Sequence, residues 1–145
     1  SFNTKSIFTA LAFSKKNVLR GMHFQVTPWA QAKLLRCISG SILEVLVNID
    51  KNSINFLKYE KILLSSKKKN IIFIPTNYAH GFLALENDTE VLYKCDKYYN
   101  PDKQITLKWN DEKINIKWNV DKQDVILSER DKDAVSFEQY FEKYD

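Results

Sequence analysis

Reactive side chains are concentrated in one short stretch of the sequence, VLRGMHFQVTPWAQAK at residues 18–33. The side chains of this stretch that could react or bind are Arg20, His23, Gln25, Gln31 and Lys33. A strand that only filled a core would not need this density of polar groups. Histidine has the side-chain pKa nearest neutrality, so proton transfer is the first chemistry to consider.

Three further candidates lie later in the chain, where the local patterns also have plain structural explanations. His80, the second of two histidines, lies in PTNYAHGF, and Tyr93 alternates with apolar residues in VLYKC. Asp131 follows Ser128 by three residues, a spacing typical of a capped helix start. Spacing alone leaves His23 as a possible satisfied strand histidine, Tyr93 as core filling and Asp131 as a simple helix cap.

The spacing of Arg20 and His23 sets a structural requirement. Residues three apart on a regular strand point to opposite faces, so one of the two would leave a shared site. Gly21 lies between them and could host a β-bulge that redirects one side chain. A site using both residues therefore predicts a bulge here.

Several kinds of site lack support in the sequence. Two histidines cannot build a three-histidine metal shell, and the sequence reads His23-Phe24-Gln25 where an H-x-H pair would be needed. Carboxylates leave a metal possible, but we expect none, and no cofactor. The chain also lacks G-x-G-x-x-G, G-x-x-x-x-G-K-[ST] and G-x-S-x-G, the motifs of dinucleotide, P-loop and α/β-hydrolase chemistry.

The sequence predicts that many short strands position these residues. The predicted strands are residues 7–13, 18–25, 33–39, 42–50, 56–64, 71–75, 80–85, 90–98 and 105–109. Turn residues separate them, which favours an all-β antiparallel sandwich or barrel forming one domain over residues 1–145. After Ser128, Ala134, Phe137, Phe141 and Tyr144 recur at three- and four-residue intervals and predict one short C-terminal amphipathic helix.

Composition narrows the partners and the compartment. The formal charge is +4, but the longest basic run is only residues 67–69 and has no aromatic platform beside it, so we expect no nucleic-acid binding. No apolar run is long enough to cross a bilayer, and we expect no membrane partner. Cys37 and Cys95 read as buried thiols of a reducing compartment, which predicts a cytoplasmic protein.

From VLRGMHFQ onward the chain resembles the nucleotide-sugar epimerases of the dTDP-4-dehydrorhamnose 3,5-epimerase family. The matching blocks continue in order with AQAKLLRCISGSILEVLVNID, IPTNYAHGFLAL, EVLYKCDKYYNP, LKWNDEKINIKW and LSERD, covering about residues 13–131. The resemblance implies a cupin-like jelly roll, usually a homodimer, with no metal or cofactor in the reaction.

The resemblance also implies a role for each candidate residue. His23 matches the catalytic base, Asp131 the carboxylate that orients it, Lys33 the lysine near the developing enolate, and Tyr93 the general acid on the opposite face of the sugar. The positions that match or could make substrate contacts are Arg20, His80, Gln25, Gln31 and Tyr99. These types fit the chemistry, because removing a proton beside a ketone needs a base and a donor at the oxyanion, and inversion needs a second acid.

The chain departs from the family in its binding apparatus. Only about a dozen residues precede the first matching block, so we expect a truncated N-terminal arm, and Phe8 and Ala10 stand where the family commonly has a Q-x-N pair. The hypothesis is an epimerase that inverts C3, C5 or both in a nucleoside-diphosphate 4-keto-6-deoxy hexose for surface polysaccharide synthesis. Two alternatives stay open, a single-centre epimerase on a non-dTDP sugar and a non-catalytic sugar-nucleotide-binding cupin.

Overall fold

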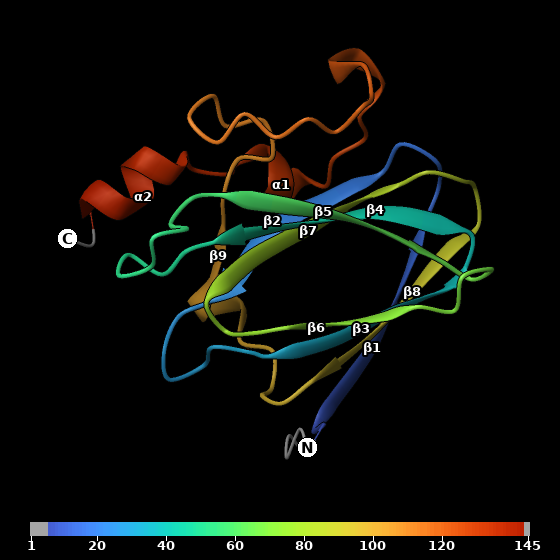
Figure 1. Cartoon of the computed structure of the whole chain (residues 1–145), viewed down its shortest axis with the longest axis horizontal. Helices are drawn as coiled ribbons and strands as arrows, with labels where there is room; N and C mark the ends of the chain where they lie inside the picture. The colour runs from blue at the N-terminus through green and yellow to red at the C-terminus, as the bar shows by residue number, and fades with distance from the viewer. Residues whose placement is uncertain (1–5, 144–145) are drawn as a thin grey trace.

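The computed structural model describes residues 6–143, which form two antiparallel sheets and a C-terminal segment (Figure 1). The strands are β1 (Phe8–Ser14), β2 (Leu19–Gln25), β3 (Lys33–Ser39), β4 (Ser41–Asn48), β5 (Tyr59–Ser65), β6 (Ile71–Ile74), β7 (Tyr78–Ala84), β8 (Thr89–Cys95) and β9 (Gln104–Thr106). Two single-turn 3₁₀ helices, η1 (Pro101–Lys103) and η2 (Lys122–Asp124), and two short helices, α1 (Glu129–Lys132) and α2 (Phe137–Lys143), complete the described elements.

The strand order is that of a jelly roll. One sheet has the order β1-β8-β3-β6, and the other has the order β5-β4-β7-β2-β9. Every pairing between named strands is antiparallel, and consecutive strands mostly cross from one sheet to the other. The prediction of an all-β, cupin-like antiparallel jelly roll with a short C-terminal helix is confirmed.

The molecule has three layers, because the C-terminal segment covers the outer face of the five-stranded sheet (Figure 1). The cluster between the sheets includes Leu35, Ile42 and Phe82. A second cluster packs the other face of the five-stranded sheet against Trp118 and Phe137 of the C-terminal segment. The five-stranded sheet is therefore apolar on both faces, whereas the four-stranded sheet has its outer face open.

Several predicted strands are longer than the observed ones, for local reasons. The strand predicted at 42–50 ends at Asn48, whose side-chain oxygen accepts a hydrogen bond from the Asp50 amide and begins a turn. The strand predicted at 105–109 ends at Thr106, because Leu107 forms a bridge to Val135 in parallel orientation. Strand existence was predictable, whereas strand ends depend on turn and tertiary hydrogen bonds.

The C-terminal tail forms two helices where the sequence predicted one. The Ser128 hydroxyl accepts from the Asp131 amide, which confirms the predicted cap of α1. Val135 then exchanges backbone hydrogen bonds with Thr106 and Lys108, and this extended residue separates α1 from α2. Tyr144, the last residue of the predicted apolar face, lies outside the described residues. Within residues 6–143, no helix is long and apolar enough to cross a membrane.

Candidate active site

The β-bulge predicted between Arg20 and His23 is present. The pairing of β2 with β7 shifts register between these two residues, and Gly21 has φ = +134°. Gly21 also lies against the backbone of Gly81, where an added Cβ would approach its Cα to 2.5 Å, so a side chain fits neither the conformation nor the space. The bulge brings Arg20 and His23 to the same cavity, as the spacing argument required.

That cavity lies between the two sheets and has a volume of about 210 Å³. Seven of the candidate residues line it: Arg20, His23, Gln31, Lys33, His80, Tyr93 and Tyr99. Cys95 and Gln104 also line it, together with Phe8, Ala10 and Ala12 on the inward face of β1. The structure therefore brings residues from six strands and two loops to a single site.

His23 and Asp131 form a close pair at one end of the site. His23 Nε2 lies 2.6 Å from Asp131 Oδ1, and the side chains are 23 % and 2 % exposed. The Ser128 hydroxyl donates to Asp131 Oδ2 at 2.9 Å. Burial alone would raise the pKa of Asp131, but hydrogen bonds from His23 and Ser128 outweigh it and leave that pKa below its usual value. An ionised Asp131 is thus hydrogen-bonded to one ring nitrogen of His23, Nε2.

A second carboxylate–histidine pair lies deeper between the sheets. His80 Nδ1 lies 2.7 Å from Glu44 Oε1, and His80 Nε2 lies 3.0 Å from Lys33 Nζ. Burial raises the pKa of Glu44 well above its usual value, although the charge of Lys33 acts in the opposite direction. Burial also lowers the pKa of Lys33, and burial together with the charges of Lys33 and His23 lowers that of His80.

Tyr93 faces the two histidines from the opposite sheet. It lies on β8 of the four-stranded sheet, whereas His23 and His80 are neighbours on β2 and β7 of the five-stranded sheet. The Tyr93 and His80 rings are 6.2 Å apart at their centroids. Burial, and then the charge of Glu44, raises the pKa of Tyr93, while Arg20 opposes the shift. The phenol is therefore held in its protonated form.

Arg20, Gln31 and Tyr99 line the cavity, and each also forms hydrogen bonds with other parts of the protein. Arg20 donates to the Phe13 carbonyl and the Ser14 hydroxyl, which ties it to the end of β1. Gln31 lines the cavity and donates to the Lys97 carbonyl. Tyr99 lines the cavity and accepts a hydrogen bond from Arg130.

Two predicted site residues do not line the cavity: Asp131, which is hydrogen-bonded to His23, and Gln25. The Gln25 amide nitrogen donates to the carbonyls of Trp29 and Tyr98, and its amide oxygen accepts from the Asn100 amide. The side chain is 3 % exposed, and its bonds join two loops beside the cavity. In this position Gln25 holds the two loops together, and its contact with a substrate stays a prediction.

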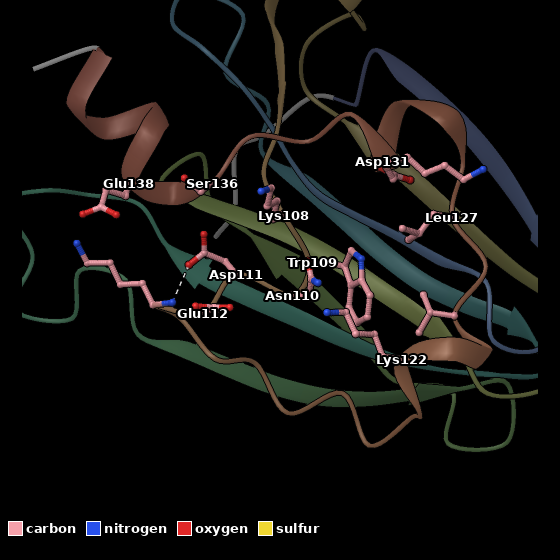
Figure 2. A pocket seen from close by; sticks show the side chains of 13 residues that line it. Lys108, Trp109, Asn110, Asp111, Glu112, Lys122, Leu127, Asp131, Ser136 and Glu138 are labelled. Carbon is pink, nitrogen blue, oxygen red and sulfur yellow. Dashed lines mark hydrogen bonds between the residues drawn. The ribbon is translucent and has the colours of Figure 1, made fainter.

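A hollow larger than this cavity lies on the far side of Asp131. It has a volume of about 610 Å³ and lies between the segment from Lys108 to Lys122 and the two C-terminal helices (Figure 2). The buried Asp111 is used within the fold, because its carboxylate accepts from the amides of Lys113, Ile114 and Phe137. We therefore place the candidate active site in the smaller cavity, where the titratable groups converge.

Glu44 was not among the residues singled out from the sequence, although a signal was present. It is the only charged residue in the apolar run of residues 42–47. A charge in such a run is either on an open sheet face or buried with partners. As to metals, no group of three histidine, cysteine, aspartate or glutamate side chains lies close enough to hold an ion in the described part of the chain.

Comparisons with known proteins give a consistent result. The model of the dTDP-4-dehydrorhamnose 3,5-epimerase family matches residues 2–139. The Escherichia coli dTDP-4-dehydrorhamnose 3,5-epimerase is 46 % identical over 99 residues, which are 68 % of this chain and 54 % of that enzyme. The chain thus spans about half the length of the first curated relatives that it matches.

Two solved structures are also similar. One is the dTDP-6-deoxy-D-glucose-3,5-epimerase of Legionella pneumophila in complex with dTDP-4-keto-L-rhamnose, with a TM-score of 0.87 and 31 % identity over 93 % of this chain and 71 % of that one. The other is ChmJ, a 3'-monoepimerase from Streptomyces bikiniensis in complex with dTDP-quinovose. It has a TM-score of 0.90 and 25 % identity over 96 % of this chain and 70 % of that one.

Proposed function

The chain belongs to the dTDP-4-dehydrorhamnose 3,5-epimerase family, and from this premise we propose that it epimerises a dTDP-linked 4-keto-6-deoxy hexose. The observation that carries the proposal is the placement of His23 and Tyr93 on opposite sheets across one cavity. Inversion at carbon needs a base on one face of the sugar and an acid on the other, and this arrangement supplies both.

His23 is the base in this proposal. Asp131 occupies Nε2, so the other ring nitrogen, Nδ1, is the one that takes the proton from the carbon beside the ketone. The aspartate fixes the tautomer and stabilises the imidazolium that forms, as a carboxylate does in other histidine-based sites. Tyr93, protonated in its buried environment, returns a proton from the opposite face.

Lys33 and Arg20 act on the oxygen that gains charge. Both line the cavity, and both present N–H groups that can donate to an enolate oxygen. Such stabilisation is strongest in an enclosed site, because little water is present to screen it. Gln31 and Tyr99 line the same cavity and are proposed as substrate contacts. A product of this kind is an expected precursor of surface polysaccharide.

Exchange with solvent tests the proposal directly. We would incubate the protein with dTDP-4-keto-6-deoxyglucose in heavy water and count the deuterons in the sugar by mass spectrometry. Uptake of two deuterons is expected for a 3,5-epimerase. If neither this substrate nor its GDP- and CDP-linked counterparts exchanged, the enzymatic proposal would be wrong and the binding-only cupin would replace it.

A single-centre epimerase is the second candidate, and the wall formed by β1 favours it. Phe8 and Ala10, which replace the family's Q-x-N pair, line the cavity, and Ala10 lies opposite Tyr93 in the β1–β8 register. An apolar wall beside the proposed acid removes hydrogen-bond partners that could turn the sugar for a second inversion. Uptake of one deuteron, located by NMR, would establish a single-centre epimerase.

A homodimer is proposed from the open face of the four-stranded sheet. This face has Leu11 and Phe13 of β1 at 50 % and 62 % exposure, with Leu34, Ile38 and Ile71 at 40–49 %. It also holds Arg36, whose Nε is buried without a hydrogen-bond partner among the described residues. Large exposed apolar side chains gathered on one sheet face are typical of an interface. We expect light scattering to give a dimer mass, and Phe13→Lys to shift it to the monomer.

A further inference from the structure

Three polar side chains form a continuous chain from the cavity into the core. Lys33 Nζ lies 3.0 Å from His80 Nε2, and His80 Nδ1 lies 2.7 Å from Glu44 Oε1. Glu44 is 0 % exposed and His80 is 5 % exposed. Lys33 comes from β3 of one sheet, whereas His80 and Glu44 come from β7 and β4 of the other. The chain therefore crosses the space between the sheets and ends at a carboxyl group without access to solvent.

The unpaired oxygen of Glu44 indicates its protonation state. Oε2 is buried and has no hydrogen-bond partner among residues 6–143. An ionised carboxylate would leave this oxygen charged and unpaired in the core, which costs more than leaving the oxygen of a neutral carboxyl unpaired. Burial favours the neutral form of all three groups, because it raises the pKa of Glu44 and lowers the pKa of both His80 and Lys33.

A resting state with all three groups neutral and the Glu44 proton on Oε1 sets the direction of each hydrogen bond. The Glu44 carboxyl donates from Oε1 to His80 Nδ1, His80 donates from Nε2 to Lys33 Nζ, and the Lys33 N–H bonds remain available to the cavity. Both links are within hydrogen-bond distance, so a proton can move along each of them without a side chain changing position.

We propose that Glu44 is the proton reservoir of the site and acts through His80 and Lys33 on the substrate oxygen that becomes negative. This inference rests on the proposed function, which supplies the enolate. As the carbon loses its proton to His23, Lys33 passes one N–H proton to the enolate oxygen in concert with gaining one from His80, so that no amide anion forms. The His80 Nε2 proton passes to Lys33, and the Glu44 proton passes to His80 Nδ1.

The number of protons is conserved in this step. The enolate becomes a neutral enol, Lys33 and His80 keep their number of protons, and Glu44 becomes the carboxylate. When the carbon is reprotonated, the enol returns its proton by the same three transfers in reverse. A negative charge is thus moved from the reacting oxygen to a buried carboxyl that does not touch the substrate.

The charged and titratable groups around Glu44 come from four strands of the two sheets. They are Lys33 on β3, His80 on β7, and His23 and Arg20 on β2, with Tyr93 and Cys95 on β8 of the opposite sheet. The charge of Lys33 favours an ionised Glu44, and burial opposes it. Because the step needs protonated Glu44, kcat falls as the pH rises through the pKa of that residue, which lies above its ordinary value.

The substitution Glu44→Gln tests the reservoir with little change of shape. The glutamine amide can still donate to His80 Nδ1, so the hydrogen-bond chain survives, but it has no proton to release. With dTDP-4-keto-6-deoxyglucose we expect kcat to fall about 100-fold, KM to stay within about threefold, and the alkaline loss of kcat due to Glu44 to disappear. Glu60→Gln, the same change at an exposed position of β5, is the matched control. A kcat within about threefold of wild type in the Glu44 variant would overturn the proposal.

The histidine tautomer gives a second readout that needs neither turnover nor a Glu44 variant. The chain has two histidines, so the ¹⁵N imidazole spectrum of the wild-type protein contains two rings, which a His23→Asn variant assigns. We expect His80 with its proton on Nε2 and a bare Nδ1. A proton on Nδ1 with a bare Nε2 would mean that Glu44 accepts this hydrogen bond instead of donating it, and would overturn the proposal. A wild-type protein that shows the expected tautomer but no turnover would refute the proposed function and leave the neutral hydrogen-bond chain standing.

Discussion

Two histidines that line the cavity each pair with a carboxylate, at nearly equal distances but in very different surroundings. His23–Asp131 spans 2.6 Å at the edge of the fold, and His80–Glu44 spans 2.7 Å between the sheets. His23 and His80 are cross-strand neighbours in the β2–β7 register, so a single pair of strands presents both rings. We call them the outer pair and the inner pair.

The surroundings give the two pairs opposite electrostatic character. Asp131 has its second oxygen bonded to Ser128, and its pKa is lowered, whereas the second oxygen of Glu44 has no partner within the described residues, and its pKa is raised. A carboxylate with both oxygens satisfied stays charged, and one buried with an orphan oxygen is driven to the neutral form. The same two residue types thus suit an oriented base in one place and a proton store in the other.

The largest expected difference is in the loss of activity when each imidazole is removed. Asparagine is close to histidine in size but cannot exchange a proton at neutral pH. We expect His23→Asn to lower kcat by at least about 1,000-fold, because the base itself is lost, and His80→Asn to lower it about 100-fold. Solvent deuterium uptake by the sugar measures both values.

Circular dichroism of both variants provides the control, since each must retain the sheet signal of the wild type. Equal losses in the two variants would remove the distinction between a reacting and a relaying histidine. Wild-type exchange in His23→Asn would show that another group is the base.

Asp131→Asn should produce the next largest effect. The amide keeps the shape, but it can present its NH₂ group to His23 and stabilise the wrong tautomer. We expect kcat to fall about 100-fold with little change in KM, measured at saturating substrate. Ser128→Ala is the control, because it removes a hydrogen bond to Asp131 and the helix cap but keeps the carboxylate. A loss of similar size in both variants would indicate that the position of α1, rather than the charge of Asp131, controls turnover.

The family resemblance implied the outer pair, whereas Glu44 of the inner pair was not singled out from the sequence. A glycine between Arg20 and His23 allowed the bulge to be predicted, and the Ser128 cap fixed the local geometry of Asp131. Glu44 lies in a strand that is apolar on both sides, so period-two alternation could not decide which face it occupies. That choice is made by the sheet order, which places His80 and Lys33 around the same face.

Strand count and type were predictable in the same way, because turn residues separate each apolar run. The split of the C-terminal tail into α1 and α2 was not, since it depends on hydrogen bonds of Val135 to Thr106 and Lys108, residues far away in sequence. Gln25 shows the same limit at the site. Its polar groups are used by carbonyls and an amide of two loops, which spacing along one strand cannot reveal.

The two pairs should also give opposite slopes of stability against pH. The lowered pKa of Asp131 contributes stability that is present above the pKa of the unfolded chain and is lost as the pH falls through the folded value. The raised pKa of Glu44 contributes stability that is present below the unfolded pKa and is lost as the pH rises through the folded value.

Unfolding in urea over a range of pH measures these slopes as differences from wild type. The stability of Asp131→Asn relative to wild type should fall as the pH rises through the range below about pH 4, and that of Glu44→Gln should rise from about pH 4 upward. Slopes of the same sign would mean that the two carboxyl groups share one protonation behaviour, and the contrast between the pairs would be wrong.

The smallest effect is expected at the exposed ion pair of α1, which separates helix stability from the function of Asp131. Lys132 Nζ lies 2.7 Å from Glu129 Oε1, and the side chains are 53 % and 88 % exposed, so water screens the attraction. We expect Glu129→Gln to change the free energy of unfolding by about 0.5 kcal/mol or less and to leave kcat unchanged. The pair lies on the same four-residue helix as Asp131, so a large loss of activity in this variant would mean that any disturbance of α1 reaches His23. An unchanged kcat would confine the effect of Asp131→Asn to the carboxylate itself.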